Sequence, residues 1–349
     1  MNMFKHILLG ALMLMVSVCG VANAQIKEKQ KKLIIAVNTP HGVGYFVDKE
    51  GTFLFNKQFW GVSAFNEGFA SVFQNGKWSF INAKGEVVIP CKYNWTWKFT
   101  EGLAVVRKGD WDNGKWGFIN TKGELVIPCI YDAVAGGFSK GLAPVSQNGK
   151  WGFINTKGEL VIPCIYDYAY EYSSEGLARV KQNGKLGFIN TKGKVVIPCK
   201  YDEAGKFSEG LARVKQNDKE GFINTKGELV IPCKYDWAWD FSEGIASVKQ
   251  NGKWGFINTK GRVVLPFIYD AAHGFSDGLA PVWLNGKWGF INTKGEVIIP
   301  CIYDNAEEFS DGLALVEKNG KWSVINTKGK VIVAKCYRDI TSWSIVEMD

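Results

Sequence analysis

Apolar and polar residues alternate along most of this chain in short runs that are separated by turn residues. In the stretch Gly176–Phe207, such runs cover Leu177–Gln182, Lys185–Asn190 and Lys194–Tyr201. Alternation with a period of two over a few residues is typical of half-buried β-strands. The pattern therefore predicts an all-β unit, made of a three-stranded meander and a following loop.

Two kinds of turn are expected within each unit. Asn183 and Gly184 separate the first two strands, and Asn-Gly is the strongest short hairpin signal because both residues must accept positive φ. The second turn, Asn-Thr-Lys-Gly, places Gly193 where a type I turn with a G1 bulge needs left-handed backbone. The asparagine of the first turn recurs at Asn75, Asn113, Asn148, Asn251, Asn285 and Asn319.

The third strand of each unit is apolar on both faces and has a proline in its middle. In Leu125–Tyr131 this pattern predicts packing on two sides. Proline cannot donate a hydrogen bond to a sheet and belongs at edges or bulges. We therefore expect the third strand to be an edge, so that the units stack as separate small sheets. The proline recurs at Pro90, Pro128, Pro163, Pro198, Pro232, Pro266 and Pro300.

The whole unit repeats at a spacing of about 35 residues, which marks a tandem-repeat architecture. Its central phrase, Lys-Trp-Gly-Phe-Ile-Asn-Thr-Lys-Gly, is complete at Lys115–Gly123, Lys150–Gly158, Lys253–Gly261 and Lys287–Gly295. The tryptophan position is occupied by Trp78, Trp116, Trp151, Leu186, Glu220, Trp254, Trp288 and Trp322. Leu186 and Glu220 depart from the phrase, and Asp218 replaces the turn glycine near Glu220, so the sixth unit is a candidate weak or specialised point.

The number of units bears on whether the array is open or closed. Leu33–Lys57 contains a degenerate first unit, and Ser344–Met348 resembles a lone first strand after the ninth unit. About nine three-stranded units exceed the usual four to eight blades of a propeller, whose blades have about four strands. We therefore favour an open or superhelical array with degenerate caps, and a closed β-propeller is the alternative.

The repeated phrase resembles the WG-repeat (KWG-repeat) family of bacterial proteins. The Val-Ile-Pro-Cys-Lys-Tyr-Asp stretch and the Phe-Ser-Glu-Gly-Leu-Ala stretch that follows it resemble that family too, and the resemblance covers about residues 33–349. It implies a bacterial, often exported, β-rich repeat protein without an established general activity. It supplies no catalytic residues to transfer to this chain.

The first residues differ from the repeats and predict export. Residues 1–24 have a basic start at Lys5, an apolar run over Ile7–Val18 and a cleavage motif that ends at Ala24, as in a secretory signal peptide. Lipidation at Cys19 is less favoured, because Val18 is not a small residue. Residues 25–32 form a charged linker, and residues 33–349 form the repeat domain. No other apolar run is long enough to span a membrane, so we expect no transmembrane segment in the mature chain.

Composition argues against several classes of function. Only three histidines occur, and no nucleophile, metal or phosphate-loop motif accompanies them, so we expect no enzyme and no cofactor or metal. The formal net charge of +8 is spread along the repeats. Nucleic acid is not an expected partner of an exported chain. A hydrolase on a propeller-like fold is a distant third possibility.

Two recurring residue types have structural explanations that we prefer to functional ones. A cysteine at one repeat position is expected to be a small buried group, with disulfides and metal binding as alternatives. An aspartate after the third strand is expected to accept hydrogen bonds from the following turn, with cation binding as the alternative. These residues are Cys91, Cys129, Cys164, Cys199, Cys233 and Cys301, and Asp132, Asp167, Asp202, Asp236, Asp270 and Asp304.

The positions at which the repeats differ are the candidate binding residues. The first and third residues after the aspartate position are aromatic in three units, and aromatic faces suit sugar rings or protein partners. The alternative is that they cover the ends of neighbouring units. These aromatic candidates are Trp95, Trp97, Tyr168, Tyr170, Trp237 and Trp239.

A second variable set lies on the first strand, where units five to seven carry a basic stripe that could bind an anionic polymer or headgroup. A solvated surface is the alternative reading of this stripe. The stripe consists of Arg179, Lys181, Arg213, Lys215 and Lys249.

These features predict an exported, non-enzymatic repeat scaffold at the bacterial cell envelope. A long repeat surface favours extended partners, so we expect a protein partner first. The alternative is a module that binds carbohydrate or envelope glycan through its loop tryptophans. The sequence leaves the oligomeric state open.

Overall fold

The computed structural model describes residues 30–38, 43–48, 52–110, 112–333 and 340–348. Lys31–Met348 forms one compact unit. The predicted signal peptide, its cleavage site and Cys19 lie outside the described residues, as does most of the predicted linker. Strand β1 (Gln30–Asn38) already begins within that linker.

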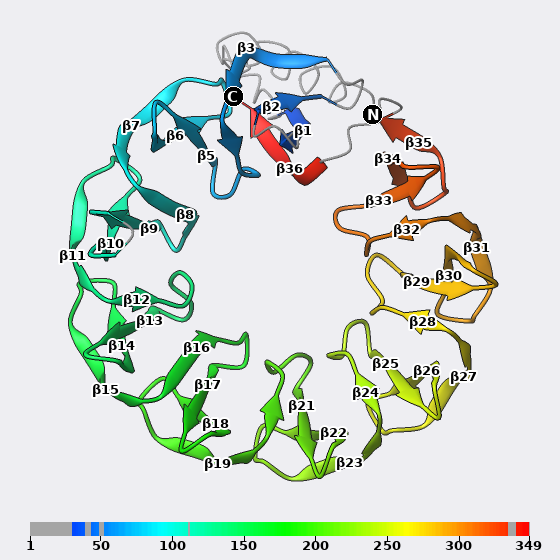
Figure 1. The fold of residues 1–349 in the computed structure, drawn as a ribbon. Coiled ribbons are helices and arrows are strands. Elements are labelled where there is room, and N and C mark those ends of the chain that lie inside the picture. The colour runs from blue at the N-terminus through cyan, green and yellow to red at the C-terminus, as the bar shows by residue number, and fades with distance from the viewer. Residues whose placement is uncertain (1–29, 39–42, 49–51, 111, 334–339, 349) are drawn as a thin grey trace, which may run out of the picture. The chain divides into compact units, whose positions relative to one another are not determined.

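The unit Lys31–Met348 consists of nine four-stranded antiparallel sheets that follow one another around a ring (Figure 1). Each sheet is a blade, and we number the blades along the chain. The described residues form strands and turns and contain no helix. The predicted all-β tandem array is therefore confirmed.

Blades two to five each use four consecutive strands. Blade two has β4 (Gly61–Val62), β5 (Phe69–Gln74), β6 (Lys77–Asn82) and β7 (Val87–Tyr93). Blade three has β8 (Trp95–Thr100), β9 (Leu103–Lys108), β10 (Lys115–Asn120) and β11 (Leu125–Tyr131). Blade four has β12 (Ala133–Val134), β13 (Leu142–Gln147), β14 (Lys150–Asn155) and β15 (Leu160–Tyr166). Blade five has β16 (Tyr168–Tyr172), β17 (Leu177–Gln182), β18 (Lys185–Asn190) and β19 (Val195–Tyr201).

Blades six to nine continue the series. Blade six has β20 (Glu203–Ala204), β21 (Leu211–Gln216), β22 (Lys219–Asn224) and β23 (Leu229–Tyr235). Blade seven has β24 (Trp237–Ala238), β25 (Ile245–Gln250), β26 (Lys253–Asn258) and β27 (Val263–Tyr269). Blade eight has β28 (Ala271–Ala272), β29 (Leu279–Leu284), β30 (Lys287–Asn292) and β31 (Val297–Tyr303). Blade nine has β32 (Asn305–Ala306), β33 (Leu313–Lys318), β34 (Lys321–Asn326) and β35 (Val331–Val333).

The first blade closes the ring, because it combines strands from both ends of the chain. Its order is β3-β2-β1-β36, with β2 (Gly44–Val47), β3 (Phe53–Phe59) and the C-terminal β36 (Ile340–Met348). The open array that the unit count favoured is therefore wrong, and the closed propeller is correct. The segment read as a lone first strand is the inner strand of blade one.

Each blade has four strands, which corrects the predicted three-stranded unit. The additional strand comes from the loop after the aspartate position, and it lies innermost in the ring (Figure 1). In most blades it contains only two residues, as in β12, β20 and β24. Two residues are too few to show a period in the sequence, so the strand is formed by pairing with its neighbour rather than by a local pattern.

The hydrophobic core lies between adjacent blades. Phe118 of β10 is fully buried, and its ring centroid lies 4.9 Å from that of Phe138 in the next blade. The same pairing recurs with Phe188 and Phe207, and with Phe222 and Phe241. Burying each such side chain contributes roughly 1.5–3 kcal/mol, so packing between blades holds the ring together.

The third strand of each repeat is the outer edge of its blade, as predicted, but it is not packed on both sides. In β11, Ile127 and Tyr131 are buried, whereas Val126, Pro128 and Ile130 are exposed. The strand's second face points away from the core, so apolar composition alone overstated its burial. Pro128 removes a hydrogen-bond donor from this exposed edge, which protects it against further strand pairing.

The predicted hairpins are present with one exception. Asn148 and Gly149 both have positive φ, at 54° and 74°, as an Asn-Gly hairpin requires. Asp218, which replaces the turn glycine of blade six, takes a φ of 58°. Asn113 is the exception, because the connection between β9 and β10 is longer and Asn113 is not among the residues with positive φ.

The recurring aspartates connect adjacent blades, which confirms their expected structural role. Asp132 accepts a hydrogen bond from Lys115 of its own repeat and, at 2.7 Å, from the backbone N–H of Asn148 in the next hairpin. The hydrogen bond from Lys115 is the largest cause that lowers the pKa of Asp132. Lysine pairs recur at Lys150–Asp167, Lys185–Asp202, Lys219–Asp236, Lys253–Asp270 and Lys287–Asp304.

A second set of contacts joins the blades at the opposite ends of their strands. The Glu101 carboxylate accepts a hydrogen bond from the backbone N–H of Gly141 in the next blade, at 3.0 Å. Equivalent contacts link Glu67 to Gly102, Glu175 to Gly210, Glu209 to Gly244, Glu243 to Gly278 and Asp277 to Gly312. These carboxylates therefore fix neighbouring blades.

The repeat cysteines are free thiols on the outer strands. Cys91, Cys129, Cys164, Cys199, Cys233 and Cys301 are all half-buried. Burial raises the pKa of Cys129, as of most of its equivalents. Cys129, Cys199, Cys233 and Cys301 pack against the cores between blades, as expected for a small apolar group.

Candidate functional site

The aromatic candidates lie at the inner strands of the ring. Trp95 and Trp97 belong to β8, and Trp237 begins β24. Trp95, Trp97, Trp237 and Trp239 are between 36% and 42% exposed, so each is partly packed and partly in contact with solvent. These rings therefore pack against neighbouring side chains and still present part of their surface to solvent, and ligand binding at them stays a prediction.

A cation lies opposite the first aromatic residue in several blades. Trp95 pairs with Arg107 across β8 and β9, and Trp237 pairs with Lys249 across β24 and β25. Tyr168 pairs with Lys181 in the same way. The two variable sets of the sequence therefore meet at the inner edge of each blade.

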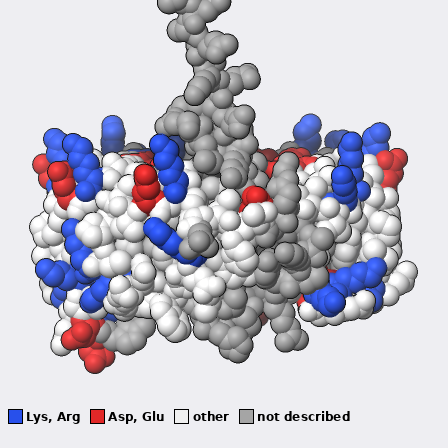
Figure 2. Space-filling model, turned by 90° about the horizontal axis from the view of Figure 1, so that it is seen from above, with Lys and Arg blue, Asp and Glu red and all other residues white. Residues whose placement is uncertain are grey.

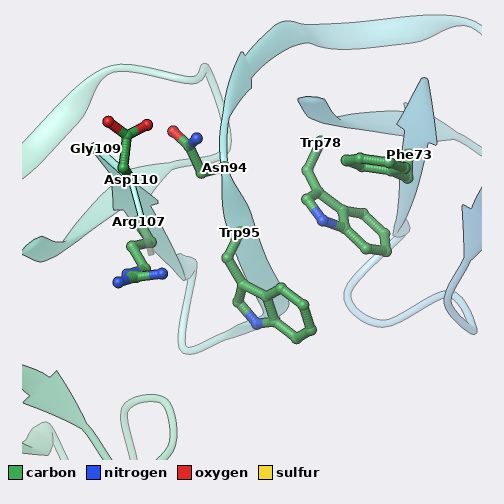
Figure 3. A pocket seen from close by; sticks show the side chains of 7 residues that line it. All are labelled: Phe73, Trp78, Asn94, Trp95, Arg107, Gly109 and Asp110. Atoms are coloured by element: carbon green, nitrogen blue, oxygen red, sulfur yellow. The ribbon is translucent and has the colours of Figure 1, made fainter. Parts of the chain in front are cut away.

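The pocket that we select as the candidate site lies between blades two and three. It has a volume of about 340 Å³ and is lined by Phe73, Trp78, Asn94, Trp95, Arg107, Gly109 and Asp110. Figure 3 shows the three aromatic side chains on one side and Asn94, Arg107 and Asp110 on the other. Apolar walls with a few placed polar groups are typical of small-molecule sites, and this volume lies at the lower end of their range.

The aromatic wall is held in place by ring contacts. The centroid of Trp78 lies 5.2 Å from that of Phe73 and 6.0 Å from that of Trp95, and the Trp78–Trp95 pair is edge-to-face. The Arg107 guanidinium carbon lies 5.6 Å from the ring centroid of Trp116. Because these contacts fix the side chains before any ligand arrives, little ordering cost remains for binding.

Two departures from the repeat create this pocket. Asn94 occupies the position at which later blades have the aspartate that joins a lysine, and no such carboxylate is present there. The hairpin between β9 and β10 is longer than the two-residue turns of other blades, and its Gly109 and Asp110 line the pocket. Insertions in a repeat array often map to the binding face.

A related arrangement with fewer lining residues is found in blade seven. Asp236, Trp237, Lys249, Gly252 and Trp254 line a cavity of about 370 Å³. Here the regular aspartate and the short hairpin are retained, so the cavity lacks the asparagine and the added hairpin residues. Blade three therefore carries the more specialised form.

The remaining aromatic candidates are engaged by neighbouring side chains. Trp97 packs against Trp116 at 6.1 Å between ring centroids, and Trp239 stacks on His273 at 5.7 Å. Tyr170 lies between Tyr168, at 4.7 Å, and the Arg179 guanidinium, at 4.1 Å. Three of the six candidates therefore line cavities beside a cation, namely Trp95, Tyr170 and Trp237. The other three, Trp97, Tyr168 and Trp239, pack against neighbouring rings.

Blade six is the unit that the sequence marks as a weak or specialised point. In blade six, Glu220 is fully buried and accepts hydrogen bonds from Arg213, at 2.5 Å, and from the backbone N–H of Ala238. Burial is the largest influence on the Glu220 carboxyl and raises its pKa, although Arg213 opposes the shift. Asp240 lies 4.0 Å from Arg213 Nε, and burial raises its pKa as well.

The basic stripe is less free than the sequence suggested. Arg213 pairs with Glu220, and Lys215 Nζ lies 3.1 Å from Glu203. Arg179 Nη1 donates a hydrogen bond to the backbone oxygen of Ala204 at 2.7 Å. Lys181 and Lys249 lie opposite Tyr168 and Trp237 within their own blades. Anion binding by the stripe stays a prediction.

Several site residues were not among the sequence candidates. Phe73, Trp78, Asn94, Arg107 and Asp110 complete the pocket around Trp95. The available signal was the spacing between Trp78 and Trp116, the longest in the array, which marks the added hairpin residues.

Charge and metal-binding potential complete the description of the surface. In the side view of Figure 2, basic and acidic side chains mix along the rims. Among the described residues, no group of three or more His, Cys, Asp and Glu side chains is arranged to hold a metal ion. Within the same residues, no helix is long and apolar enough to cross a membrane.

The family model for the WG containing repeat matches eight consecutive segments of the chain between residues 46 and 322. The chain therefore belongs to the family of WG-containing-repeat proteins. No curated protein matches it in sequence.

Two solved structures are similar in fold. A crystal structure of the eukaryotic initiation factor aligns with a TM-score of 0.65 and 11% identity, over 90% of this chain and 98% of that one. Porphyromonas gingivalis dipeptidyl peptidase 4 aligns with a TM-score of 0.52 and 13% identity, over 81% of this chain and 60% of the peptidase. At these identities the similarity concerns the fold alone.

Proposed function

We propose that this WG-repeat protein is an exported, non-enzymatic propeller that binds an envelope glycan. The binding site is the aromatic pocket where blade three departs from the repeat. The observation that carries the proposal is the pocket at Trp95. The leader-like residues 1–24 support export.

The chemistry of the pocket suits a sugar ring. Trp78, Trp95 and Phe73 offer apolar surface for the C–H face of a pyranose. Asn94, Arg107 and Asp110 provide donors and acceptors for hydroxyl groups on the opposite side. Polar groups placed in this way fix orientation, while the aromatic wall supplies most of the contact area.

The absence of catalysis is part of the proposal. Among the described lining residues, Asp110 is the single carboxylate, whereas glycoside hydrolysis ordinarily uses a pair of carboxyl groups. We therefore expect bound oligosaccharides to be released unchanged, which chromatography of the sugar after prolonged incubation tests.

The binding test uses fragments of bacterial envelope glycans and the intrinsic tryptophan fluorescence of the mature protein. We expect quenching that saturates. Trp95→Ala should reduce the affinity roughly 5- to 150-fold, because one stacked aromatic contributes about 1–3 kcal/mol by substitution. Trp60→Ala is the matched control, since Trp60 is 65% exposed and does not line the pocket. Equal losses in both variants, or no quenching by any fragment, would refute glycan binding.

A protein-interaction scaffold is the second candidate, and the outer strands favour it. Exposed aliphatic residues recur there in successive blades, among them Leu125, Leu160, Leu229, Val263 and Val297. Recurrent exposed apolar surface often marks an interface. This reading predicts a protein that co-purifies at a fixed molar ratio and is lost in a Leu229→Lys, Val263→Lys variant but retained in Trp95→Ala.

A further inference from the structure

Among blades two to nine, the two that lack the repeat tryptophan share a second substitution. At the third position of the first repeat strand, they have Arg179 and Arg213. The other described repeats have Ser71, Val105, Pro144, Ser247, Pro281 and Leu315 at this position, most of them buried. An arginine therefore replaces a serine or an apolar residue in each of the two blades.

The two arginines differ in how their charge is compensated. Arg213 forms an ion pair with Glu220, which occupies the tryptophan position of its own blade. In blade five that position is Leu186, which offers no charge. Among the described residues, no carboxylate lies within 4.0 Å of the Arg179 guanidinium.

Arg179 is nevertheless held in one orientation. Nη1 donates a hydrogen bond to the Ala204 oxygen, and the guanidinium lies over the Tyr170 ring at 4.1 Å. Burial lowers the pKa of Arg179, so the surrounding protein does not fully replace the solvation of its charge. The remaining guanidinium N–H groups are available as donors, and a guanidinium fork matches the two oxygens of a carboxylate.

A cavity adjoins this guanidinium. It has a volume of about 410 Å³, and Tyr170, Glu171, Arg179, Lys206 and Ser208 are among its lining residues. Glu171 accepts a hydrogen bond from the backbone N–H of Gly137 at 2.7 Å. The lining carries two cations and one carboxylate, and Asp240, outside the lining, also attracts both cations. At most one positive charge therefore remains for a ligand, which suits a monoanion better than a phosphate dianion.

The lining also contains hydroxyl groups that are suited to a sugar. Ser208 donates to the Phe241 oxygen at 2.8 Å, and Ser174 donates to Glu175 at 2.8 Å. Their oxygens keep acceptor capacity towards the cavity, because a hydroxyl can both donate and accept.

We propose that this cavity binds the carboxylate of an acidic sugar, with Arg179 and Lys206 as the anion ligands. The assignment rests on the proposed glycan function, and it specifies that the glycan carries uronic acid units. The Trp95 pocket then holds a sugar ring at one inner position, and the Arg179 cavity selects for charge at another.

The test uses sodium glucuronate and uncharged glucose as paired probes of the full mature chain, monitored by NMR titration. Glucuronate should bind the wild type more tightly than glucose. Arg179→Met, which keeps the aliphatic stem, should weaken glucuronate binding about tenfold or more and leave glucose binding unchanged, because a charge-assisted hydrogen bond is lost. Arg262→Met is the control, since Arg262 is an exposed arginine outside the cavity.

The outcomes separate this inference from the proposed function. Equal binding of glucuronate and glucose, tighter binding of inorganic phosphate, or an unchanged Arg179→Met variant would overturn the carboxylate site. If the carboxylate site is overturned in one of these ways, saturable quenching by neutral glycans that depends on Trp95 would still support the proposed glycan binding. A melting temperature of Arg179→Met close to that of the wild type excludes misfolding as the cause of weaker glucuronate binding. If charge is the feature recognised, Arg179→Lys should keep part of the glucuronate affinity that Arg179→Met loses.

Discussion

The buried ion pair of blade six allows a quantitative test of how this ring tolerates a departure from its repeat. Glu220 is fully buried, and the Arg213 side chain is one-fifth exposed, with 2.5 Å between Nη1 and Oε1. Replacing Glu220 by glutamine keeps the shape and removes the charge. Arg213 is then left with Asp240, whose nearest oxygen lies 4.0 Å from Nε.

Removing one partner of a buried pair costs about 3–5 kcal/mol, and the partial exposure of Arg213 points to the lower end of that range. For a chain of 349 residues, an unfolding entropy of about 2.1 cal/mol/K per residue converts about 3 kcal/mol into a fall of roughly 4 °C in melting temperature. Differential scanning calorimetry at neutral pH and a fixed scan rate measures this change.

The chain supplies its own matched control. Blade seven and the start of blade eight have Ser247, Trp254 and Gly274 at the corresponding positions. The triple variant Arg213→Ser, Glu220→Trp, Asp240→Gly transplants this arrangement, and it should melt at or above the wild-type temperature because well-packed apolar groups replace buried charges at little cost. A Glu220→Gln variant that melts within about 1 °C of the wild type would refute the reasoning.

Three further predictions concern stability and thiol chemistry. Asp218→Gly should raise the free energy of unfolding by about 0.5–1 kcal/mol, measured by denaturant titration, because glycine accepts the φ of 58° without strain; Asp218→Ala should not. Asp236→Asn should lower the melting temperature at neutral pH, because Lys219 depresses the pKa of Asp236 in the folded protein. The stability that this carboxylate contributes is present above its unfolded-state pKa and is lost as the pH falls through its folded-state pKa. The melting temperatures of the variant and the wild type should therefore converge in acid. The repeat cysteines should react slowly with a thiol reagent in the native protein and rapidly after unfolding, and pretreatment with a reductant should leave the melting temperature unchanged.

The local parts of the fold could be predicted from the sequence, because each depends on neighbouring residues. Alternation located the strands of Leu177–Gln182 and Lys185–Asn190, Asn183-Gly184 located a hairpin, and the proline located the outer edge. Ring closure depends on β36 pairing with β1 across nearly the whole chain, and no local pattern reports such a contact. The two-residue inner strands were missed for the related reason that they arise only through pairing.

The candidate site was predictable in part. Trp95 and Trp237 were identified because the repeats differ at their positions, and both line cavities beside a cation. Trp78 was classed as a repeat residue, yet it forms one wall of the pocket, since adjacent blades meet there. The buried ion pair between Arg213 and Glu220 could not be predicted from the sequence either, because a charged residue at a variable position can equally face solvent.

The most direct test of glycan binding at Trp95 is an NMR titration that observes the indole N–H groups of the mature protein, assigned through single Trp→Phe variants. Envelope oligosaccharide should shift the signals of Trp78 and Trp95 and leave that of Trp322 in blade nine unchanged, because Trp78 and Trp95 line the pocket and Trp322 packs in another core. Unchanged Trp78 and Trp95 signals at saturating oligosaccharide, or shifts confined to other tryptophans, would contradict the account.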